Sequence, residues 1–259
     1  MTTTTETEID MSGVKRSLTP LICINNAVVA YQNVVALANI NLDVYEGEIL
    51  GICGPNGSGK STLLKAILNL VPLSYGTIRF YSKDPLMQPC EEYHQGINIG
   101  YVPQIHNIDR NFPALVEDVV AMGRYAQVGF LKRVKRTDPY IENALRSVDM
   151  WKFRKRPIGH LSGGQQQKVM IARSLASNPK IMLLDEPTAA LDFRIERAIM
   201  DLIQQLHQKQ NLTIILVTHR MSFLRDFTTR VVCLDKSIIW EGEPSDPKLQ
   251  TIINQLFFQ

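Results

Sequence analysis

Residues 54–61 read Gly-Pro-Asn-Gly-Ser-Gly-Lys-Ser and fill every required position of the phosphate-binding loop pattern G-x-x-x-x-G-K-[ST]. The apolar run 49–53 leads directly into this segment. After it, apolar residues recur at helical spacing, at Leu63, Ala66, Ile67 and Leu70. The order predicts a buried strand, a tight loop and a helix, and so restricts the chain to an α/β fold.

The chemistry of this loop is that of a nucleoside triphosphate site. Its glycines let successive backbone N–H groups point at phosphate oxygens, and the start of the helix adds its positive end. Lys60 is expected to reach the outer phosphates, and Ser61 to offer its hydroxyl to Mg²⁺. The alternative, a glycine-rich turn with an accidental lysine, leaves the flanking strand and helix unexplained. The predicted nucleotide-binding residues of the loop are Gly54, Pro55, Asn56, Gly57, Ser58, Gly59, Lys60, Ser61 and Thr62.

A phosphate loop also needs a carboxylate for Mg²⁺ and a group that activates water, both at the end of a neighbouring buried strand. The run 181–184 is apolar throughout and is followed by Asp185 and Glu186. We predict that Asp185 engages Mg²⁺ directly or through its water, and that Glu186 is the general base. Two adjacent acids could also be a solvated strand end.

Residues 161–165 form a third motif, Leu-Ser-Gly-Gly-Gln. Ser162 and Gln165 have the spacing of a capping box, so the segment predicts a helix start whose glycines leave N–H groups bare for an anion. One nucleotide does not need two such helix ends in one subunit. We therefore interpret Leu161, Ser162, Gly163, Gly164 and Gln165 as a surface that acts on the nucleotide of a second copy in a dimer.

Composition limits the alternatives. The 259 residues are 45% hydrophobic and 20% charged, which suffices for one large core with or without a subdomain and excludes a disordered protein. The net charge is only +3, so no strong overall field indicates nucleic acid as a partner. The basic run 132–136 is interpreted as a solvated turn between helices rather than as a nucleic-acid or lipid contact.

Two further features concern the cellular setting. No run approaches 18 uninterrupted apolar residues, and the acidic, Thr-rich start lacks the regions of a signal peptide. The four cysteines are scattered without C-x-x-C pairing, which favours reduced thiols over a disulfide frame or a zinc site. These features predict a cytoplasmic chain.

The hydrophobic pattern also predicts the domain organisation. Alternation within 21–44 indicates antiparallel strands, while the apolar runs 181–184 and 213–217 are typical of central parallel strands covered on both faces. Helical spacing dominates between them and predicts a helical subdomain at about 105–176, in which Asp138 and Pro139 start one helix. A further amphipathic helix is predicted after Asp192, with Ile195, Ile199, Leu202 and Leu206 on one face. The predicted boundaries are a disordered tail at 1–19, a domain at 20–245 and a C-terminal helix at 246–259.

Together, these motifs resemble the ATP-binding cassette (ABC) family from about residue 21 to residue 243. The resemblance implies a P-loop NTPase core of the α/β class, with a mainly parallel central sheet, an antiparallel β subdomain and an inserted α-helical subdomain. It also implies hydrolysis of ATP with Mg²⁺. Arg220 departs from the family pattern, which often places an acid after the switch histidine. This departure leaves the local interface electrostatics open, but not the ATPase assignment.

The resemblance assigns roles to further residues. Tyr31 lies where the family has an adenine-stacking aromatic, Gln104 matches the Q-loop, and His219 matches the γ-phosphate sensor. Taken alone, they could be a packed strand aromatic, a loop amide and an ordinary histidine. The implied groups are Lys60, Gln104, Glu186 and His219 for catalysis, Ser61, Gln104 and Asp185 for Mg²⁺, and Ala190, Leu191 and Asp192 for the dimer loop.

The resemblance implies a homodimer that drives separate integral membrane permease subunits from the cytoplasmic face of the membrane, with no nucleic acid. Residues 101–113 and 118–125 look like those of importers of manganese, zinc or iron, and more weakly like those of iron-chelate and haem importers. Such importers work with an extracytoplasmic metal-binding protein. The alternatives are another ABC importer or exporter, or a soluble ABC assembly ATPase.

Overall fold

The computed structural model describes residues 20–81, 97–104, 108–128, 134–189 and 191–257. It forms two compact units, one made of residues up to Ile97 together with Thr213–Gln259, the other of Asn98–Leu212. The predicted tail at 1–19 lies outside the described residues, as does Ala190 of the predicted dimer loop. The first unit is therefore discontinuous in sequence, and the second is continuous.

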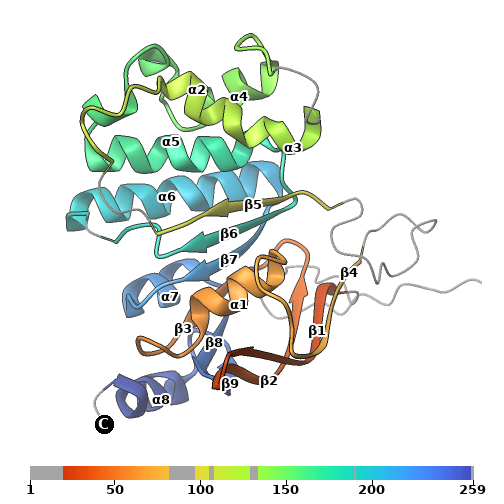
Figure 1. Ribbon diagram of the computed structural model, residues 1–259. Helices are drawn as coiled ribbons and strands as arrows, with labels where there is room; N and C mark the ends of the chain where they lie inside the picture. Colours follow the sequence, from red (N-terminus) through yellow and green to blue (C-terminus); the bar gives the residue numbers. More distant parts are fainter. Residues whose placement is uncertain (1–19, 82–96, 105–107, 129–133, 190, 258–259) are drawn as a thin grey trace, which may run out of the picture. The chain divides into compact units, whose positions relative to one another are not determined.

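An antiparallel sheet forms one part of the first unit (Figure 1). Its strands are ordered β2-β1-β4, and β1 pairs antiparallel with both neighbours. Alternation places Ile22, Ile24 and Leu42 in the core. The predicted antiparallel subdomain is thus confirmed. The strand bounds are Pro20–Tyr31 for β1, Val34–Tyr45 for β2 and Tyr75–Phe80 for β4.

The other strands of the first unit are mostly parallel. β3 pairs in parallel with β7 on one side and with β8 on the other, and β9 pairs antiparallel with β8. Every residue of β3 and β7 is buried, because both faces of these strands are covered. Both neighbours of β3 come from after residue 212. The bounds are Ile49–Cys53 for β3, Thr213–Val217 for β7, Arg230–Asp235 for β8 and Ser237–Gly242 for β9.

Helix α1, Lys60–Ile67, follows the phosphate loop as predicted but ends one turn before Leu70. Asn69 adopts a left-handed φ of 54°. The Asn69 amide donates to the Ala66 carbonyl (3.0 Å), and the Leu70 amide donates to the Lys65 carbonyl (2.8 Å). These bonds form a Schellman cap, which stops the helix. Leu70 is consequently 64% exposed and lies beyond the helix, so the predicted continuation of the helix to Leu70 was wrong.

Arg230 links several strands of the first unit through a buried ion cluster. Its guanidinium donates to both carboxylate oxygens of Glu48, at 3.1 and 2.7 Å, and also contacts Glu241 on β9. Burial alone would lower the pKa of Arg230, but the two carboxylates raise it above the ordinary value. Glu48 immediately precedes β3, so the cluster fixes the entry of the strand that carries the phosphate loop.

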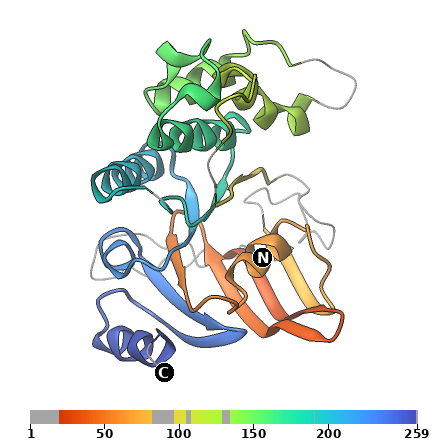
Figure 2. The same cartoon turned by 60° about the vertical axis from the view of Figure 1, so that its left-hand side comes forward.

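Two helices complete the first unit. Helix α7, Met221–Phe227, follows β7, and helix α8, Pro247–Phe257, lies against β8 and β9 (Figures 1 and 2). Leu249 and Ile253 of α8 are buried, whereas the opposite face of α8 is exposed. The expected C-terminal helix therefore covers the edge of this unit.

The second unit begins with two parallel strands, β5 and β6, in which Tyr101 pairs with Leu183 and Val102 with Leu184. Helix α6 buries Ile199, Met200 and Ile203. A similar face was expected, but Leu202, which was predicted to lie on it, is only partly buried. The bounds are Ile99–Val102 for β5, Ile181–Asp185 for β6 and Phe193–Gln210 for α6.

The remaining helices of the second unit are arranged around α5. One side of α5 packs against α2 and α4, and the other against α6 (Figure 1). Asp138 caps α4 by accepting a hydrogen bond from the Tyr140 amide, with Pro139 in the first turn as expected. The α-helices are α2, Val116–Ala121, α3, Tyr125–Val128, α4, Pro139–Ser147, and α5, Gly163–Ala176; short 3₁₀ turns are η1, Met122–Arg124, η2, Trp151–Phe153, and η3, Ile158–His160. The second unit, Asn98–Leu212, is longer than the helical subdomain proposed at about 105–176, because it also includes β5, β6 and α6.

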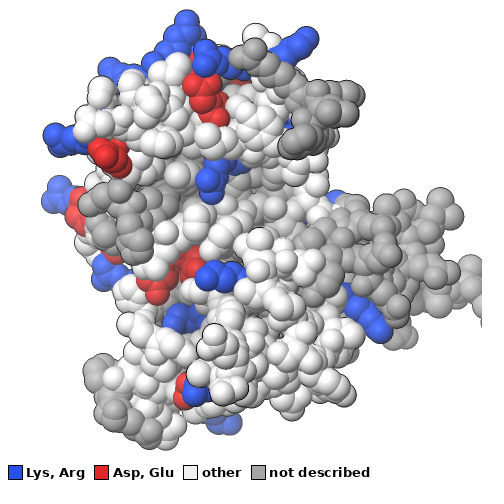
Figure 3. Space-filling view, viewed as in Figure 1, with Lys and Arg blue, Asp and Glu red and all other residues white. Residues whose placement is uncertain are grey.

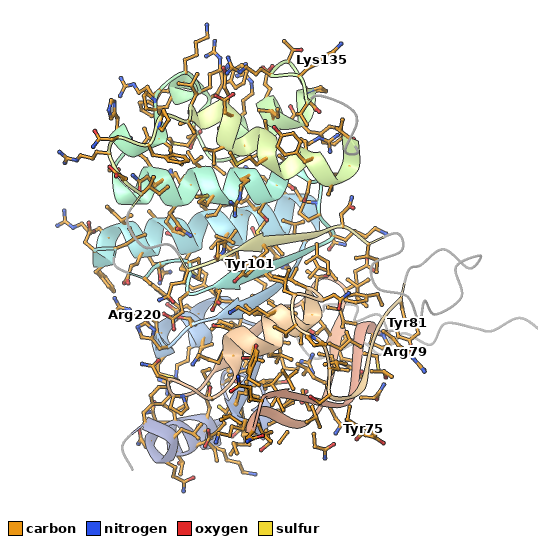
Figure 4. All side chains as sticks on the ribbon, viewed as in Figure 1. Tyr75, Arg79, Tyr81, Tyr101, Lys135 and Arg220 are labelled. Atoms are coloured by element: carbon orange, nitrogen blue, oxygen red, sulfur yellow. The ribbon has the colours of Figure 1, made fainter. Side chains whose placement is uncertain are left out.

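Basic side chains spread over the surface of these helices (Figure 3). Within the basic run, Lys135 is exposed and labelled in Figure 4. Arg136 forms ion pairs with Asp118 (2.8 Å) and Glu117 (3.6 Å). This arrangement agrees with a solvated turn for residues 134–136, while Lys132 and Arg133 lie outside the described residues. Among the helices that the structure describes, none combines the length and the apolar composition that crossing a bilayer requires.

Candidate active site

The phosphate loop is held by close backbone contacts. A Cβ placed on Gly54 would lie 2.0 Å from the Leu234 carbonyl oxygen, so no other residue fits there. Gly59 has a φ of +98°, and a Cβ on it would lie 2.6 Å from the Ala36 carbonyl oxygen. Close contacts with the backbone therefore exclude a side chain at both positions, and at Gly59 the left-handed conformation also favours glycine.

Lys60 lies at the first position of α1 and is only 8% exposed. Its Nζ donates to the Gly54 carbonyl oxygen (2.9 Å) and the Pro55 carbonyl oxygen (2.8 Å). The ammonium group is thus fixed over the loop, with the charge that an outer phosphate requires.

The residues of the loop fit a phosphate group. Ser58 Oγ is buried and has no hydrogen-bond partner within the described residues. The first turn of α1 contains no acidic residue, and its N-cap, Gly59, supplies no side chain to the free amides. Ser61 is exposed at this helix end, and its hydroxyl is the kind of oxygen ligand that Mg²⁺ prefers.

Two other candidate residues of the first unit lie at strand ends. His219 follows β7 and is exposed, and the amide of the preceding Thr218 donates to the Ile52 carbonyl oxygen (3.2 Å) on β3. His219 therefore follows β7, and β7 is a parallel neighbour of β3, the strand that leads into the phosphate loop. Tyr31 ends β1 and is 45% exposed, so its ring is available rather than packed in the core.

Arg220 is the N-cap residue of α7, at the same end of β7 (Figure 4). Its backbone amide donates to Thr218 Oγ1 (3.1 Å). The sequence departure at this position therefore leaves the strand-to-helix turn intact.

In the second unit, Asp185 is the last residue of β6 and Glu186 follows it, as predicted. Asp185 is 5% exposed, and Glu186 has a left-handed φ of 47°. A residue with a Cβ rarely adopts this conformation, and such strain is concentrated at functional sites. Gln104, just after β5, donates from Nε2 to Glu186 Oε2 (3.1 Å). The structure thus brings together two of the residues that the motif analysis singled out.

Tyr101 is a neighbour of Asp185 that the motif analysis did not assign. It lies on β5 (Figure 4), and its phenol hydrogen-bonds to the Asp185 carboxylate. Burial raises the pKa of Tyr101 above its ordinary value, and the negative charge and hydrogen bond of Asp185 raise it further. The signal in the sequence was its place three residues before Gln104, but the contact depends on the pairing of β5 with β6.

The predicted capping box is present at the start of α5. Gln165 N donates to Ser162 Oγ, and Ser162 N donates to Gln165 Oε1. Gly163 is exposed, but Gly164 is buried, and a Cβ on it would lie 2.5 Å from Ile195 Cγ2. The two glycines thus differ: the first faces outward, while the second allows close packing against α6.

The predicted dimer loop ends at the N-cap of α6. Asp192 accepts a hydrogen bond from the Ile195 amide (3.0 Å), and Leu191 lies against Gly163. Asp192 therefore has a structural function in addition to the interface role predicted for it.

Comparison with known proteins decides the family. Residues 37–189 match the family described as ABC transporter. The chain belongs to the ABC transporter family. Its ABC domain implies that it binds ATP and is an ATP hydrolase, in agreement with the loop geometry.

ABC proteins with curated names resemble the chain over most of their length. The manganese transport system ATP-binding protein MntB of Bacillus subtilis (strain 168) is 44% identical over 212 residues, which cover 82% of each chain. The high-affinity zinc uptake system ATP-binding protein ZnuC of the same organism is 37% identical over 218 residues, covering 83% of this chain and 91% of the relative.

Solved ABC structures share the fold. A metal-chelate type ABC transporter in an inward-facing conformation aligns with a TM-score of 0.79 and 31% identity, covering 92% of this chain and 89% of the other. The dimeric post-hydrolysis state of the ATP-binding cassette MJ0796, bound to ADP and phosphate, aligns with a TM-score of 0.68 and 30% identity, covering 87% and 99%. The P-loop NTPase fold of the ABC type is thereby confirmed.

Proposed function

We propose that the chain is the ATP-hydrolysing subunit of a transporter that imports a divalent metal ion or metal chelate, with manganese as the favoured cargo. The observation that carries this proposal is the 44% identity to a manganese transport ATP-binding protein, against 37% to a zinc uptake protein. The metal is the cargo of the permease and is not a ligand of this chain. Zinc and iron remain the other candidates.

The roles of the site residues follow from their positions in each unit. Lys60 and the loop amides bind the phosphates, Tyr31 stacks on the adenine, and His219 senses the γ-phosphate. Ser61, Gln104 and Asp185 are the proposed Mg²⁺ residues, and the ion when bound would neutralise phosphate charge. Glu186 accepts the proton of the attacking water, oriented by its hydrogen bond from Gln104.

The start of α5 is proposed to act on the nucleotide of a second copy. The exposure of Ser162 and Gly163 supports this proposal, because both remain accessible to a partner. A dimeric cassette among the similar structures, bound to ADP and phosphate, also supports a homodimer. Leu191 and Asp192, beside this surface, would belong to the same interface, and so would Ala190.

Gly163→Asp is expected to retain ATP binding and to lower hydrolysis by a factor on the order of a hundred, because it places a carboxylate against the partner's phosphates. Gly163→Ala is the matched control, since the nearest atom to a new Cβ is the flexible end of Leu191 at 3.2 Å. Nucleotide binding and phosphate release are measured for both variants. Mixing Gly163→Asp with Lys60→Ala should restore one intact composite site, and equal losses for the two Gly163 variants would contradict a charge effect in trans.

The proposed assembly places two copies at the cytoplasmic face of a membrane, bound to integral permease subunits. An extracytoplasmic metal-binding protein would deliver the ion to the permease. Another ABC importer or exporter, or a soluble assembly ATPase, is the alternative. Purification from detergent extract separates a transporter of any kind from a soluble assembly ATPase, because only a transporter retains a hydrophobic integral partner.

Cells that lack the protein are expected to grow poorly when divalent metals are chelated, and to recover on addition of manganese. Cellular manganese, zinc and iron are measured by mass spectrometry in the deletion strain and in strains complemented with the wild type or with Glu186→Gln. Recovery by zinc or iron alone would assign the cargo differently. Normal metal content under chelation would contradict import of any of the three.

A further inference from the structure

A pair of thiols lies directly beneath the phosphate loop. Cys53, the last residue of β3, is the register partner of Cys233 on β8. Their sulfurs are 3.2 Å apart, and the residues are 1% and 0% exposed. No role in nucleotide binding or hydrolysis requires sulfur at either position. The two residues are 180 positions apart in sequence and meet only through strand pairing.

The backbone geometry allows a bond between these sulfurs. Register partners on adjacent strands have Cα atoms about 4.8 Å apart, which lies within the range of disulfide-bonded cysteines. Because they are directly paired, their side chains project from the same face of the sheet. Bond formation requires the sulfurs to approach to about 2.05 Å, so they must move closer by more than about 1 Å.

The two thiols are chemically unequal. The hydrogen bond between them lowers the pKa of Cys233 relative to an ordinary thiol, although burial opposes this effect. The same hydrogen bond and burial raise the pKa of Cys53. With the Cys53 thiol as the donor, the hydrogen bond stabilises the thiolate of Cys233, which is the nucleophilic form.

We propose that Cys53 and Cys233 are a reversible oxidation site, at which a small peroxide forms a disulfide that weakens ATP binding. The Cys233 thiolate attacks one oxygen of hydrogen peroxide and breaks the O–O bond, giving a sulfenic acid and hydroxide. The Cys53 sulfur then attacks the sulfenic sulfur and displaces its oxygen as water. In sum, two thiols and one peroxide give one disulfide and two waters, and a dithiol reductant reverses the change.

The link to nucleotide binding is the packing of the next residue on each strand. Gly54 follows Cys53, Leu234 follows Cys233, and a Cβ on Gly54 would meet the Leu234 carbonyl oxygen at 2.0 Å. This contact leaves no room for a shift of either strand end that accompanies the approach of the sulfurs. The Gly54 carbonyl oxygen also accepts a hydrogen bond from the Lys60 ammonium group (2.9 Å). Movement of Gly54 therefore changes the position of the loop and of its charge.

Helix α8 covers the pair. Cys53 and Cys233 share a buried cluster with Leu249 and Ile253 of this helix, which lies over β8 (Figures 1 and 2). Oxidation requires this cover to open, so we expect a small oxidant to react with the pair faster than a bulky thiol reagent does. This cover favours intramolecular disulfide formation over modification by larger molecules.

The test uses the full chain with Cys23→Ala and Cys90→Ala, so that the pair supplies the only thiols. ATP affinity is first measured in the reduced protein, which separates a failure of this proposal from a failure of the nucleotide site. After hydrogen peroxide treatment, we expect a peptide linked through Cys53 and Cys233 in the mass spectrum. We also expect an at least tenfold loss of ATP affinity, which dithiothreitol restores.

Cys233→Ala in the same background is the resistant control, with Cys233→Val as a second variant if the alanine protein does not fold. Both are expected to keep their ATP affinity in peroxide. The proposal is overturned if no linked peptide forms, if the disulfide form binds ATP as well as the reduced form, or if the Cys233 variant loses affinity to the same extent as the parent.

Discussion

Replacing Lys60 with alanine is expected to lower ATP turnover by a factor on the order of a thousand, since it removes a fixed positive charge from the transferred phosphate. The side chain is buried and held by the Gly54 and Pro55 carbonyl oxygens, so its charge is fixed over the loop. The affinity for ATP should fall as well. Phosphate release and equilibrium nucleotide binding measure the two effects separately.

Lys65→Ala is the matched control for this variant. Lys65 lies on the same helix, one turn later, but it is exposed. The Lys65→Ala substitution makes the same change of charge and side-chain length outside the phosphate loop, so ATP turnover should stay near the wild-type value. Equal losses in the two variants would show that the overall charge, rather than the position of Lys60, determines activity.

The second large effect is expected for Glu186→Gln. The amide fills the same space and can still accept the hydrogen bond from Gln104 through its oxygen, but it cannot take the proton of water. Hydrolysis should therefore decrease on the order of a thousandfold while ATP binding persists. Gel filtration should then show a dimer in the presence of ATP.

Glu142→Gln tests the same chemical change at a distant position of the second unit. Glu142 pairs with Arg146 on α4 at 2.7 Å and is partly exposed, so its loss should cost little activity. If Glu186→Gln hydrolyses ATP at the wild-type rate, another group is the general base. If it fails to bind ATP, its role is in binding rather than in proton transfer.

The features predicted best from the sequence are those set by neighbouring residues. The phosphate loop, the capping box of Ser162 and Gln165, and the Asp138–Pro139 helix start each depend on a few consecutive positions, and all have the expected local structure. The end of α1 depends on the left-handed conformation of Asn69, which apolar spacing does not report. Leu70 was misplaced for this reason.

The features that the sequence did not reveal depend on distant pairing. Tyr101 meets Asp185, and Cys53 meets Cys233, only because their strands are neighbours. The difference between Gly163 and Gly164 likewise depends on where α6 packs. The dimer roles proposed for residues 161–165 and 190–192 require a second copy of the chain, so they stay predictions.

The position of β3 between β7 and β8 has a consequence for biosynthesis. A nascent chain that has reached residue 212 contains the whole second unit but neither strand that flanks β3. The second unit, which is continuous in sequence, is therefore expected to fold first on the ribosome. The phosphate loop can take its shape only after β7 and β8 have emerged. A chain cut short at residue 212 would carry the complete loop sequence and still bind no nucleotide.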